Sequence, residues 1–223
     1  MTITTFPATE TDTINAARPW ADRVQRRLLL PLVRALFPLT IAGQRGLLAL
    51  PTPCIFAADH GSHLDTLAIL AALPDAVRTR VRVAAAADYW YRDPLRRLAV
   101  SALGGFPFPR KGILGLTRAA ALLDSGQCIL IYPEGTRGGG PFRPGVARLA
   151  AQAGVPVVPI AVRGGRALWP KGRALPRRGP LTVTFGAPLR IAPGTSSEEA
   201  TRRIEAAVRA LAATPAATVP VAA

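Results

Sequence analysis

Residues 128–162 read CILIYPEGTRGGGPFRPGVARLAAQAGVPVVPIAV and contain three segments of different pattern. The apolar run at 128–132 predicts a buried strand, because a short apolar run closed by Pro and Gly is typical of one. Residues 145–152 carry apolar side chains at helical spacing and stop before Gly154, and residues 157–162 form a second apolar run. A strand, a helix and a strand in this order are typical of an α/β sheet.

The same alternation extends from residue 50 to residue 213. Short apolar runs predict further strands, and apolar residues spaced three to four apart predict the helices between them. The other expected strands are 52–58, 81–86, 106–108 and 181–185, and the other expected helices are 65–73, 94–103, 114–124 and 196–213. We therefore expect an α/β fold in which helices pack against a central sheet.

The composition limits the class of protein. The chain has 223 residues, of which 49% are hydrophobic, so it suits one folded domain and not a disordered chain. Its 28 lysines and arginines outnumber 13 acidic residues, and only Lys111 and Lys171 are lysines. Because arginine forms bidentate contacts with phosphate and carboxylate, this charge admits nucleic acid, an anionic membrane or an anionic substrate as a partner. A codon bias toward Ala and Arg is the alternative source of the excess.

The N-terminal part predicts a basic amphipathic helix over residues 20–39, bent at Pro31. Such a helix either lies in a membrane interface or packs on the domain. The longest charge-free stretches have 14 residues, so no membrane-spanning helix is expected. The first residues, MTITTFPATETDT, are polar and acidic and not basic and then apolar, so no secretory signal is expected either. The expected division is a disordered lead at 1–17, a membrane-associating helical segment at 18–48, a folded domain at 49–213 and a disordered tail at 214–223.

Both histidines of the chain lie in the segment DHGSHLD at 59–65, directly after the expected strand 52–58. The carboxyl end of a strand is the usual place for a site in an α/β sheet. Asp65, in the first turn of the next helix, can reach back to one imidazole nitrogen of His60. Such a pair is a general base, because the carboxylate fixes the tautomer and stabilises the imidazolium. Alternatively, Asp65 only stabilises the amino terminus of its helix.

Two other chemistries fit this segment less well. A zinc site would use His60, His63 and Asp65, but zinc takes three or four ligands and the chain has no third histidine. We therefore expect no metal. Ser62 as a nucleophile lacks the flanking glycines of a Gly-x-Ser-x-Gly turn.

Two further clusters combine cations with sharp turns. Residues 104–111, GGFPFPRK, place Arg110 and Lys111 at the end of a short stiff strand. Residues 132–138, YPEGTRG, follow an expected strand, and their turn exposes Glu134, Gly135, Thr136 and Arg137. A sharp turn that carries an arginine suits a phosphate group. Each cluster alone is also compatible with an ordinary surface loop.

Together and in this order, the clusters resemble the motifs of the glycerolipid acyltransferase family, which includes the lysophosphatidate acyltransferases. The family's His-x-x-x-x-Asp motif is matched by His60 and Asp65, with Ser62 also matching. Four more elements are matched in order, namely a Gly-to-Arg motif at 104–110, Phe-Pro-Glu-Gly-Thr-Arg-Ser at 132–138, Phe-Lys-x-Gly at 142–145 and Val-Pro-x-x-Pro at 155–159. The departures from these motifs are Asp59 for Asn, Pro109 for an acidic residue, Tyr132 for Phe and Gly138 for Ser.

The resemblance implies a central mixed β-sheet flanked by helices, so that residues 49–213 form an acyltransferase domain. It also implies transfer of a fatty acyl group from acyl-CoA or acyl carrier protein to the hydroxyl of a lysophospholipid. The expected acceptor is 1-acyl-sn-glycerol-3-phosphate, which gives phosphatidic acid, and another lysolipid or alcohol is the alternative. No cofactor is expected besides the acyl donor.

By the same resemblance, His60 is the general base and Asp65 orients it. The residues expected to bind substrate are Ser62, Arg110, Lys111, Glu134, Gly135, Thr136 and Arg137. Glu134 is expected to hold an arginine or a backbone amide, because an ionised carboxylate does not bind phosphate directly. The backbone near Val157 and Pro159 is expected to stabilise the oxyanion.

Alternatives from other classes remain. A nucleic-acid-binding protein would explain the charge, but aromatic residues are only 6% and no nucleic-acid-binding motif is present, so no nucleic acid is expected as a partner. A family member that binds lipid without catalysis is opposed by the intact His60 and Asp65. The arginines outside the site are expected to hold a peripheral protein on an anionic membrane, at its cytoplasmic face, for about 1 kcal/mol each.

Overall fold

The computed structural model of the chain describes residues 18–50, 52–137, 139–170 and 172–214. The expectations for residues 1–17 and for the tail after 214 concern parts outside the described residues. Seven strands form one sheet, in the order β1-β7-β6-β2-β5-β3-β4. Their bounds are β1 Leu39–Ala42, β2 Ile55–Ala58, β3 Val81–Ala86, β4 Gly105–Phe108, β5 Cys128–Ile131, β6 Val157–Arg163 and β7 Leu181–Phe185.

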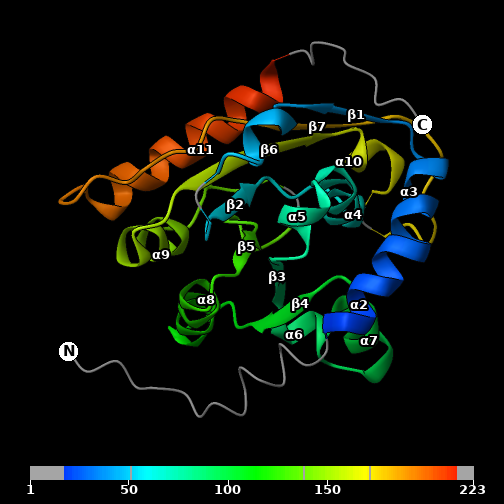
Figure 1. Ribbon diagram of the computed structural model, residues 1–223, viewed down its shortest axis with the longest axis horizontal. Helices are drawn as coiled ribbons and strands as arrows, with labels where there is room; N and C mark the ends of the chain where they lie inside the picture. Colours follow the sequence, from blue (N-terminus) through cyan, green and yellow to red (C-terminus); the bar gives the residue numbers. More distant parts are fainter. Residues whose placement is uncertain (1–17, 51, 138, 171, 215–223) are drawn as a thin grey trace.

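The sheet is mixed, because β6 and β7 pair antiparallel while every other neighbouring pair is parallel. Helices lie on both of its faces (Figure 1). The bounds of the longer helices are α4 His63–Ala72, α7 Pro94–Ala102, α8 Leu114–Asp124, α9 Gly145–Ala153 and α11 Ser197–Ala213. The expected α/β fold with a central mixed sheet is confirmed.

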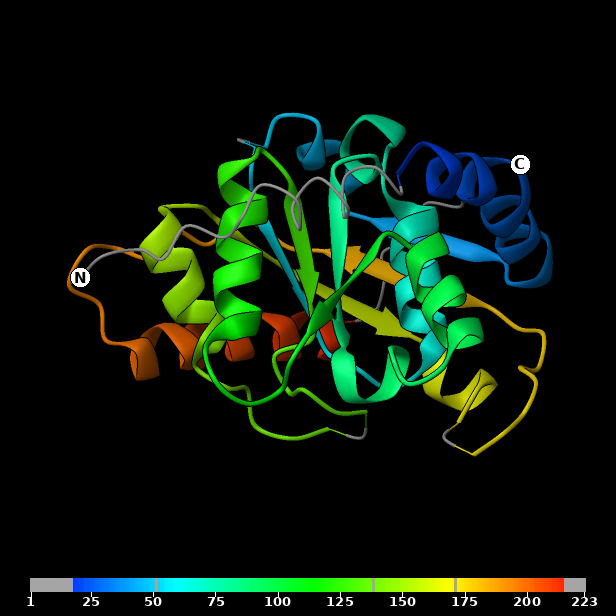
Figure 2. The same ribbon diagram turned by 90° about the horizontal axis from the view of Figure 1, so that it is seen from below.

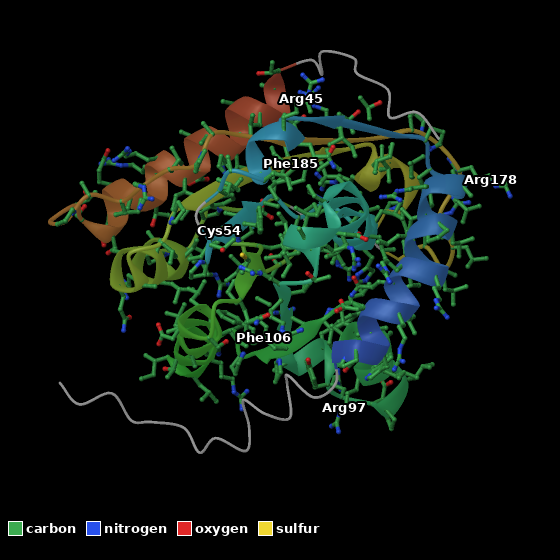
Figure 3. All side chains as sticks on the ribbon, viewed as in Figure 1. Arg45, Cys54, Arg97, Phe106, Arg178 and Phe185 are labelled. Atoms are coloured by element: carbon green, nitrogen blue, oxygen red, sulfur yellow. The ribbon has the colours of Figure 1, made fainter. Side chains whose placement is uncertain are left out.

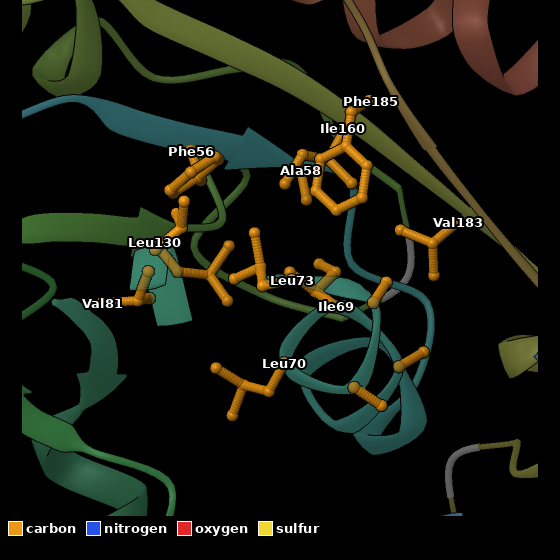
Figure 4. Packing of buried hydrophobic residues seen from close by; sticks show 14 of the residues in the cluster. Phe56, Ala58, Ile69, Leu70, Leu73, Val81, Leu130, Ile160, Val183 and Phe185 are labelled. Carbon is orange, nitrogen blue, oxygen red and sulfur yellow. The ribbon is translucent and has the colours of Figure 1, made fainter. Parts of the chain in front are cut away.

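Two apolar clusters fill the space on either side of the sheet. On one face, side chains of β2, β6 and β7 pack against Ile69 and Leu70 of α4 (Figure 4). On the other face, the helices α8, α9 and α11 lie over the sheet (Figure 2), and their apolar side chains pack against those of β2, β5 and β6. Because β2 and β5 are covered on both faces, all their residues are apolar and buried, as is usual for parallel strands.

Charged side chains lie around this core. In Figure 3, Arg45, Arg97 and Arg178 lie at the periphery of the molecule, whereas Cys54 and Phe106 lie inside it. These three arginines therefore carry their positive charge at the surface, where a partner can reach it.

The N-terminal helix contains a π-turn before Pro31. It consists of α2 Arg18–Val24, a π-turn Gln25–Leu29 and α3 Leu30–Leu36. The N–H of Leu30 bonds to the carbonyl of Gln25, directly before Pro31, which has no N–H to donate. In this helix Leu28 and Leu32 are 61% and 50% exposed. The residues that this helix buries are Ala21, Gln25, Leu30 and Val33, followed by Phe37.

The helix packs on the domain through that buried face. The side chain of Gln25 donates to the carbonyl of Ala102 at 2.9 Å and accepts from the buried guanidinium of Arg78 at 2.9 Å. The outer face leaves arginines and two leucines exposed. Among the described residues, none of the helices is both long enough and apolar enough to cross a bilayer.

The helix also ends earlier than expected, at Leu36. Phe37 precedes Pro38 and is extended, as residues before proline prefer to be. The chain then forms β1, which pairs with β7, so the expected boundary between a helical segment at 18–48 and the domain is displaced. The four residues of β1 are too few for a strand to be predicted from their apolar pattern. Four short helices were likewise not expected, the 3₁₀-helix Gln44–Leu47, α5 Asp75–Arg78, α6 Ala87–Trp90 and α10 Gly165–Leu168.

Candidate active site

The loop between β2 and α4 places His60 and Asp65. β2 ends at Ala58, and Ser62 is the N-cap of α4. The Ser62 hydroxyl accepts from the N–H of Leu64 at 3.2 Å, while the Asp65 carboxylate accepts from the N–H of Ser62 at 2.7 Å. This reciprocal capping box fixes the direction in which the chain enters α4.

The same carboxylate oxygen of Asp65 also holds His60. Oδ2 accepts from the N–H of Gly61 at 2.8 Å and lies 3.2 Å from Nδ1 of His60. Because this oxygen accepts from two N–H groups and is almost fully buried, it is a strong acceptor, and Nδ1 of the imidazole carries the proton that faces it. Asp65 is thus the helix cap and also contacts His60 through Nδ1, so the geometry is compatible with both interpretations of Asp65, and among the described residues Nε2 of His60 has no hydrogen-bond partner.

Three neighbours hold this pair in place. Tyr132 stacks on the His60 ring at a centroid distance of 4.0 Å, and its hydroxyl bonds to that of Thr66 at 2.7 Å. Burial raises the pKa of the Tyr132 phenol, which therefore stays neutral. On the other side, α10 packs so closely that a Cβ on Gly165 would lie 2.3 Å from Oδ1 of Asp65. The hydroxyl of Ser62 donates to the carbonyl of Trp169 at 2.8 Å.

His60 opens onto a cavity of about 300 Å³. Among its lining residues are three arginines, Arg110, Arg137 and Arg143, together with Gly135 and Thr136 of the YPEGTRG turn. Apolar lining residues come from strands and helices of the domain, namely Val83, Val100, Leu103, Leu116, Ile131 and Val146. The cavity therefore combines an imidazole with arginines and with apolar walls.

The arginines have weak partners in this structure. Arg110 forms an ion pair with Asp88 at 3.1 Å, in which both side chains are more than one-third exposed. The guanidinium of Arg137 lies 5.7 Å from the centre of the Tyr89 ring. Exposed ion pairs contribute only about 0–1 kcal/mol, so an anionic ligand can displace Asp88 from Arg110 at low cost.

Three expected substrate-binding residues lie outside the cavity lining. Ser62 is buried, and its hydroxyl bonds to the backbone at Leu64 and Trp169, which gives it a structural position. Lys111 is exposed beside Arg110. Glu134 belongs to the YPEGTRG turn, but its side chain is buried and does not line the cavity. Burial and the charge of Asp59 raise the pKa of Glu134, while hydrogen bonding with the backbone of His60 and Gly139 opposes that rise.

The expected oxyanion role of Val157 and Pro159 is wrong. The N–H of Val157 donates to the carbonyl of Leu189 at 2.8 Å, and Pro159 has no N–H. Both residues are buried within β6 and neither lines the cavity. The Val-Pro-x-x-Pro segment therefore builds the sheet and donates no hydrogen bond to the cavity.

Several cavity residues were not singled out from the sequence. Arg143 lies beside Gly135, where a Cβ would be 3.4 Å from its guanidinium carbon, and the Phe-Arg-Pro-Gly element at 142–145 was a signal for it. Tyr89 and Trp90 follow the carboxyl end of β3, the position at which α/β sheets place sites. His63 contacts both rings. Burial, Arg137 and His60 lower the pKa of His63 to about 4, so it is neutral at pH 7.

A metal is not suggested by the side chains that surround the cavity. Within residues 18–50, 52–137, 139–170 and 172–214, no group of three or more His, Cys, Asp or Glu side chains is arranged to hold a metal ion.

Comparison with known proteins gives three concordant results. A family model described as Acyltransferase matches residues 43–163. A chloroplastic 1-acyl-sn-glycerol-3-phosphate acyltransferase of Brassica napus is 31% identical over 140 residues, which are 59% of this chain and 39% of that protein. A 1-acyl-sn-glycerol-3-phosphate acyltransferase of Limnanthes alba is 28% identical over 142 residues, 60% of this chain and 50% of that protein. The chain thus spans half or less of the length of these two relatives.

A solved structure shares the fold. The 1-acyl-sn-glycerophosphate acyltransferase PlsC from Thermotoga maritima superposes with a TM-score of 0.66 over 90% of this chain and 81% of that chain, at 21% sequence identity. The likeness therefore includes most of the mixed sheet and its flanking helices.

Proposed function

The chain belongs to the acyltransferase family, and we propose that it moves a fatty acyl group from acyl-CoA or acyl carrier protein to the hydroxyl of a lysophospholipid. The proposed acceptor is 1-acyl-sn-glycerol-3-phosphate, and the product is then phosphatidic acid. The observation that carries the proposal is the His60–Asp65 pair at a cavity that also contains three arginines and an apolar wall. A phosphate, an acyl chain and a hydroxyl are the three groups that such a cavity can hold together.

In the proposed reaction, Nε2 of His60 takes the proton of the acceptor hydroxyl while the oxygen attacks the thioester carbonyl. Asp65 stabilises the imidazolium, and the carbon–sulfur bond then breaks. The leaving thiolate takes a proton from the imidazolium, so an ester and a free thiol are formed without an acyl-enzyme. General-base catalysis supplies about 10²–10⁴-fold, and the remaining acceleration comes from holding both substrates in place.

The acceptor phosphate is assigned to the three cavity arginines. Arg110 exchanges its ion pair with Asp88 for the phosphate, and Arg137 and Arg143 approach from the turn and the segment behind it. The apolar residues of the same cavity are assigned to an acyl chain. Burial of such a chain is favourable by about 0.8 kcal/mol for each CH₂ group.

The membrane surface is the proposed source of the acceptor. Leu28 and Leu32 are exposed on the outer face of the N-terminal helix, beside the exposed arginines Arg26, Arg27 and Arg34. An amphipathic surface of this composition binds an anionic interface through apolar insertion and charge. We propose a peripheral association at the cytoplasmic face.

The catalytic proposal is tested by giving the purified protein palmitoyl-CoA and 1-acyl-sn-glycerol-3-phosphate and measuring free thiol and phosphatidic acid. His60→Ala is expected to lower the rate by about 10²–10⁴-fold. Arg203→Ala, on the exposed face of α11, is the control and is expected to keep the rate. Full activity of a folded His60→Ala protein would end the proposal.

The membrane proposal is tested by sedimentation with vesicles of phosphatidylglycerol and phosphatidylcholine. A Leu28→Ser/Leu32→Ser protein is expected to bind the anionic vesicles at least tenfold more weakly. Leu48→Ser, which changes a leucine that is 68% exposed elsewhere on the surface, is the matched control. Equal loss in both proteins would contradict a role for the N-terminal helix.

A further inference from the structure

The helix α7 lies at one end of the molecule and is almost uncovered. Of its nine residues, all of them described, only Val100 is buried. Leu95 and Leu98 are 76% and 57% exposed. Because residues three apart lie on the same face of a helix, the two leucines form an apolar stripe on the outer face of α7.

A second exposed apolar segment follows the next strand. In the connection between β4 and α8, Ile113 is 78% exposed, and Leu114, the first residue of α8, is 38% exposed. β4 lies between the two segments and contacts both α7 and α8. In Figure 1, α7, β4 and α8 lie along the lower end of the molecule, and Figure 2 shows the protein from that end. We call the exposed side chains of residues 92–98 and 110–114 the rim surface, and exposed apolar side chains gathered in this way mark a binding surface.

The same two segments line the active-site cavity from within. Val100 of α7 and Leu103, which ends that helix, are lining residues, and so are Arg110 and Gly112 of the connection before α8. Phe108, the last residue of β4, lines the cavity between them. The rim surface therefore borders the cavity, and a molecule bound to this surface lies next to the site.

The rim surface is also basic. Residues 87–114 contain five cations and two acidic residues. The cations are all exposed, namely Arg92, Arg96, Arg97, Arg110 and Lys111. Each acidic residue is in an exposed ion pair with one of these arginines, Asp93 with Arg96 and Asp88 with Arg110, both at 3.1 Å. Leucines that alternate with arginines suit an anionic bilayer, because the apolar side chains enter the acyl region while the guanidinium groups stay at the phosphates.

The N-terminal helix extends this surface. α2 packs against α7, and the side chain of Gln25 donates to the carbonyl of Ala102, the last residue of α7. The outer face of the N-terminal helix has the same composition, with Leu28 and Leu32 exposed beside arginines. Two joined helices that both expose leucine and arginine fit a single extended partner, and a bilayer is such a partner.

We propose that the rim surface lies on an anionic bilayer and that the acceptor lipid enters the cavity between α7 and the connection at 110–114. The exposed leucines and Ile113 insert among the acyl chains, and the exposed cations contact lipid phosphates. A lysophospholipid then passes from the bilayer to the cavity without exposing its acyl chain to water, which would be unfavourable. The entry route rests on the proposed function, whereas the contact with the bilayer does not.

The contact is tested in the full chain with the environment-sensitive fluorophore nitrobenzoxadiazole on single introduced cysteines. The natural cysteines, Cys54 and Cys128, are fully buried and do not compete for the label. Vesicles of phosphatidylglycerol and phosphatidylcholine are then added. Labels on Leu98→Cys and Ile113→Cys are expected to emit more strongly and at shorter wavelength, because the fluorophore moves from water into the apolar part of the bilayer.

A label on Leu48→Cys is the control, since this leucine is 68% exposed. In Figure 3, Arg45, three residues before Leu48, lies at the opposite end of the view from Arg97 of α7. The control label is expected to keep its emission. If the labels at 98 and 113 do not respond, or if the control label responds equally, the proposal is overturned.

A protein partner is distinguished from a bilayer with the Leu95→Ser/Leu98→Ser variant. This variant is expected to sediment with the anionic vesicles about tenfold more weakly than the wild type, because two apolar side chains no longer insert. Its mass in solution, measured by light scattering, is expected to equal that of the wild type. A changed mass with unchanged vesicle binding would make this face of α7 an interface between copies of the chain and would overturn the proposal.

The entry route is tested with an acceptor in two forms, using the same variant. One is 1-hexanoyl-sn-glycerol-3-phosphate dissolved in water, and the other is 1-oleoyl-sn-glycerol-3-phosphate in anionic vesicles. Neither Leu95 nor Leu98 lines the cavity, so kcat/KM for the dissolved acceptor is expected to stay within about twofold of the wild type, while kcat/KM for the acceptor in vesicles falls about tenfold.

Other kinetic results would overturn the entry route. Equal losses for the two acceptors would mean that the leucines act on the site itself. No loss for either acceptor would mean that the lipid enters elsewhere. If the wild type transfers an acyl group to neither acceptor, the proposed function fails, while the fluorescence of the labels still decides the contact with the bilayer.

Discussion

The two sides of the cavity are built by different means. On the side of the base, the polar groups around Asp65 are buried and bonded to the backbone or to each other before any substrate arrives. On the side of the arginines, Arg110 is an exposed partner of Asp88, and Arg137 lies over the Tyr89 ring. The first side is preorganised, whereas the second has to exchange its partners when a ligand binds.

The two kinds of construction differ in energy. A buried hydrogen bond to a charged group contributes about 1.5–3 kcal/mol, whereas an exposed ion pair contributes about 0–1 kcal/mol. A substitution near His60 and Asp65 therefore changes the position of the imidazole, and no other group in the cavity replaces it. A substitution of a cavity arginine weakens the binding of the anionic substrate and leaves proton transfer by His60 unchanged. Changes on the first side should lower kcat, and changes on the second should raise KM.

The largest effect is expected for Asp65→Asn. The amide oxygen can take the place of Oδ2 beside Gly61, Ser62 and His60, but the amide is neutral, so it cannot stabilise the imidazolium that forms when His60 takes a proton. We expect kcat to fall by about 10³-fold with a small change in KM. Steady-state kinetics with both substrates saturating measure this, and Asp124→Asn is the exposed control. A kcat within tenfold of the wild type would show that the carboxylate matters only as a helix cap.

The next effect is expected for Gly165→Ala. A methyl group there would lie 2.3 Å from Oδ1 of Asp65, so either α10 or the carboxylate has to move. Displacements of about 1 Å cost up to about 10²-fold in rate, and we expect a loss of kcat of that order. Gly46→Ala, where a Cβ meets nothing within 4 Å, is the matched control. Equal kinetics for the two variants would mean that the preorganised side tolerates displacement.

This second variant illustrates what sequence reasoning could not supply. The alternation of apolar runs predicts the expected strands and the longer helices within a few residues at each end, and the resemblance to the acyltransferase family is confirmed. α10 has four residues and no apolar period, and it meets Asp65 from a position 100 residues away in the chain. The contact between Gly165 and Asp65 therefore cannot be predicted from the local sequence pattern of either segment.

The error at Val157 and Pro159 has a similar cause. These residues match a motif, but a motif does not say whether an N–H is already bonded in a sheet. The deciding interaction is a backbone hydrogen bond, which neither a motif nor side-chain periodicity reports.

A smaller effect is expected for Arg137→Ala, on the side of the arginines. Loss of charge-assisted hydrogen bonds to a phosphate should raise the KM for the lysophospholipid by about tenfold and leave kcat within a few-fold. Arg203→Ala is the control, since it removes an exposed arginine from α11. The comparison of the two sides fails if Arg137→Ala lowers kcat as Asp65→Asn does.

The smallest effect concerns His63, which lies between the two sides and contacts Tyr89 and Trp90. Its pKa of about 4 in the folded protein is below the unfolded value of about 6.5, so between these pH values the unfolded chain binds more protons. The free energy of unfolding contributed by this group therefore decreases as the pH falls from about 6.5 to about 4.

Asp59 and Glu134 have the opposite sign, because their raised pKa values make the folded protein bind more protons than the unfolded chain, so their contribution decreases as the pH rises. We expect His63→Gln to flatten the decrease in Tm on the acid side, and Asp59→Asn to flatten the decrease on the side of higher pH. Thermal unfolding between pH 4 and pH 8 measures both slopes. If the curves of Tm against pH are parallel for His63→Gln and the wild type, then burial and the neighbouring charges do not keep His63 neutral. His63 would then belong with the exposed arginines and not with the preorganised side of the cavity.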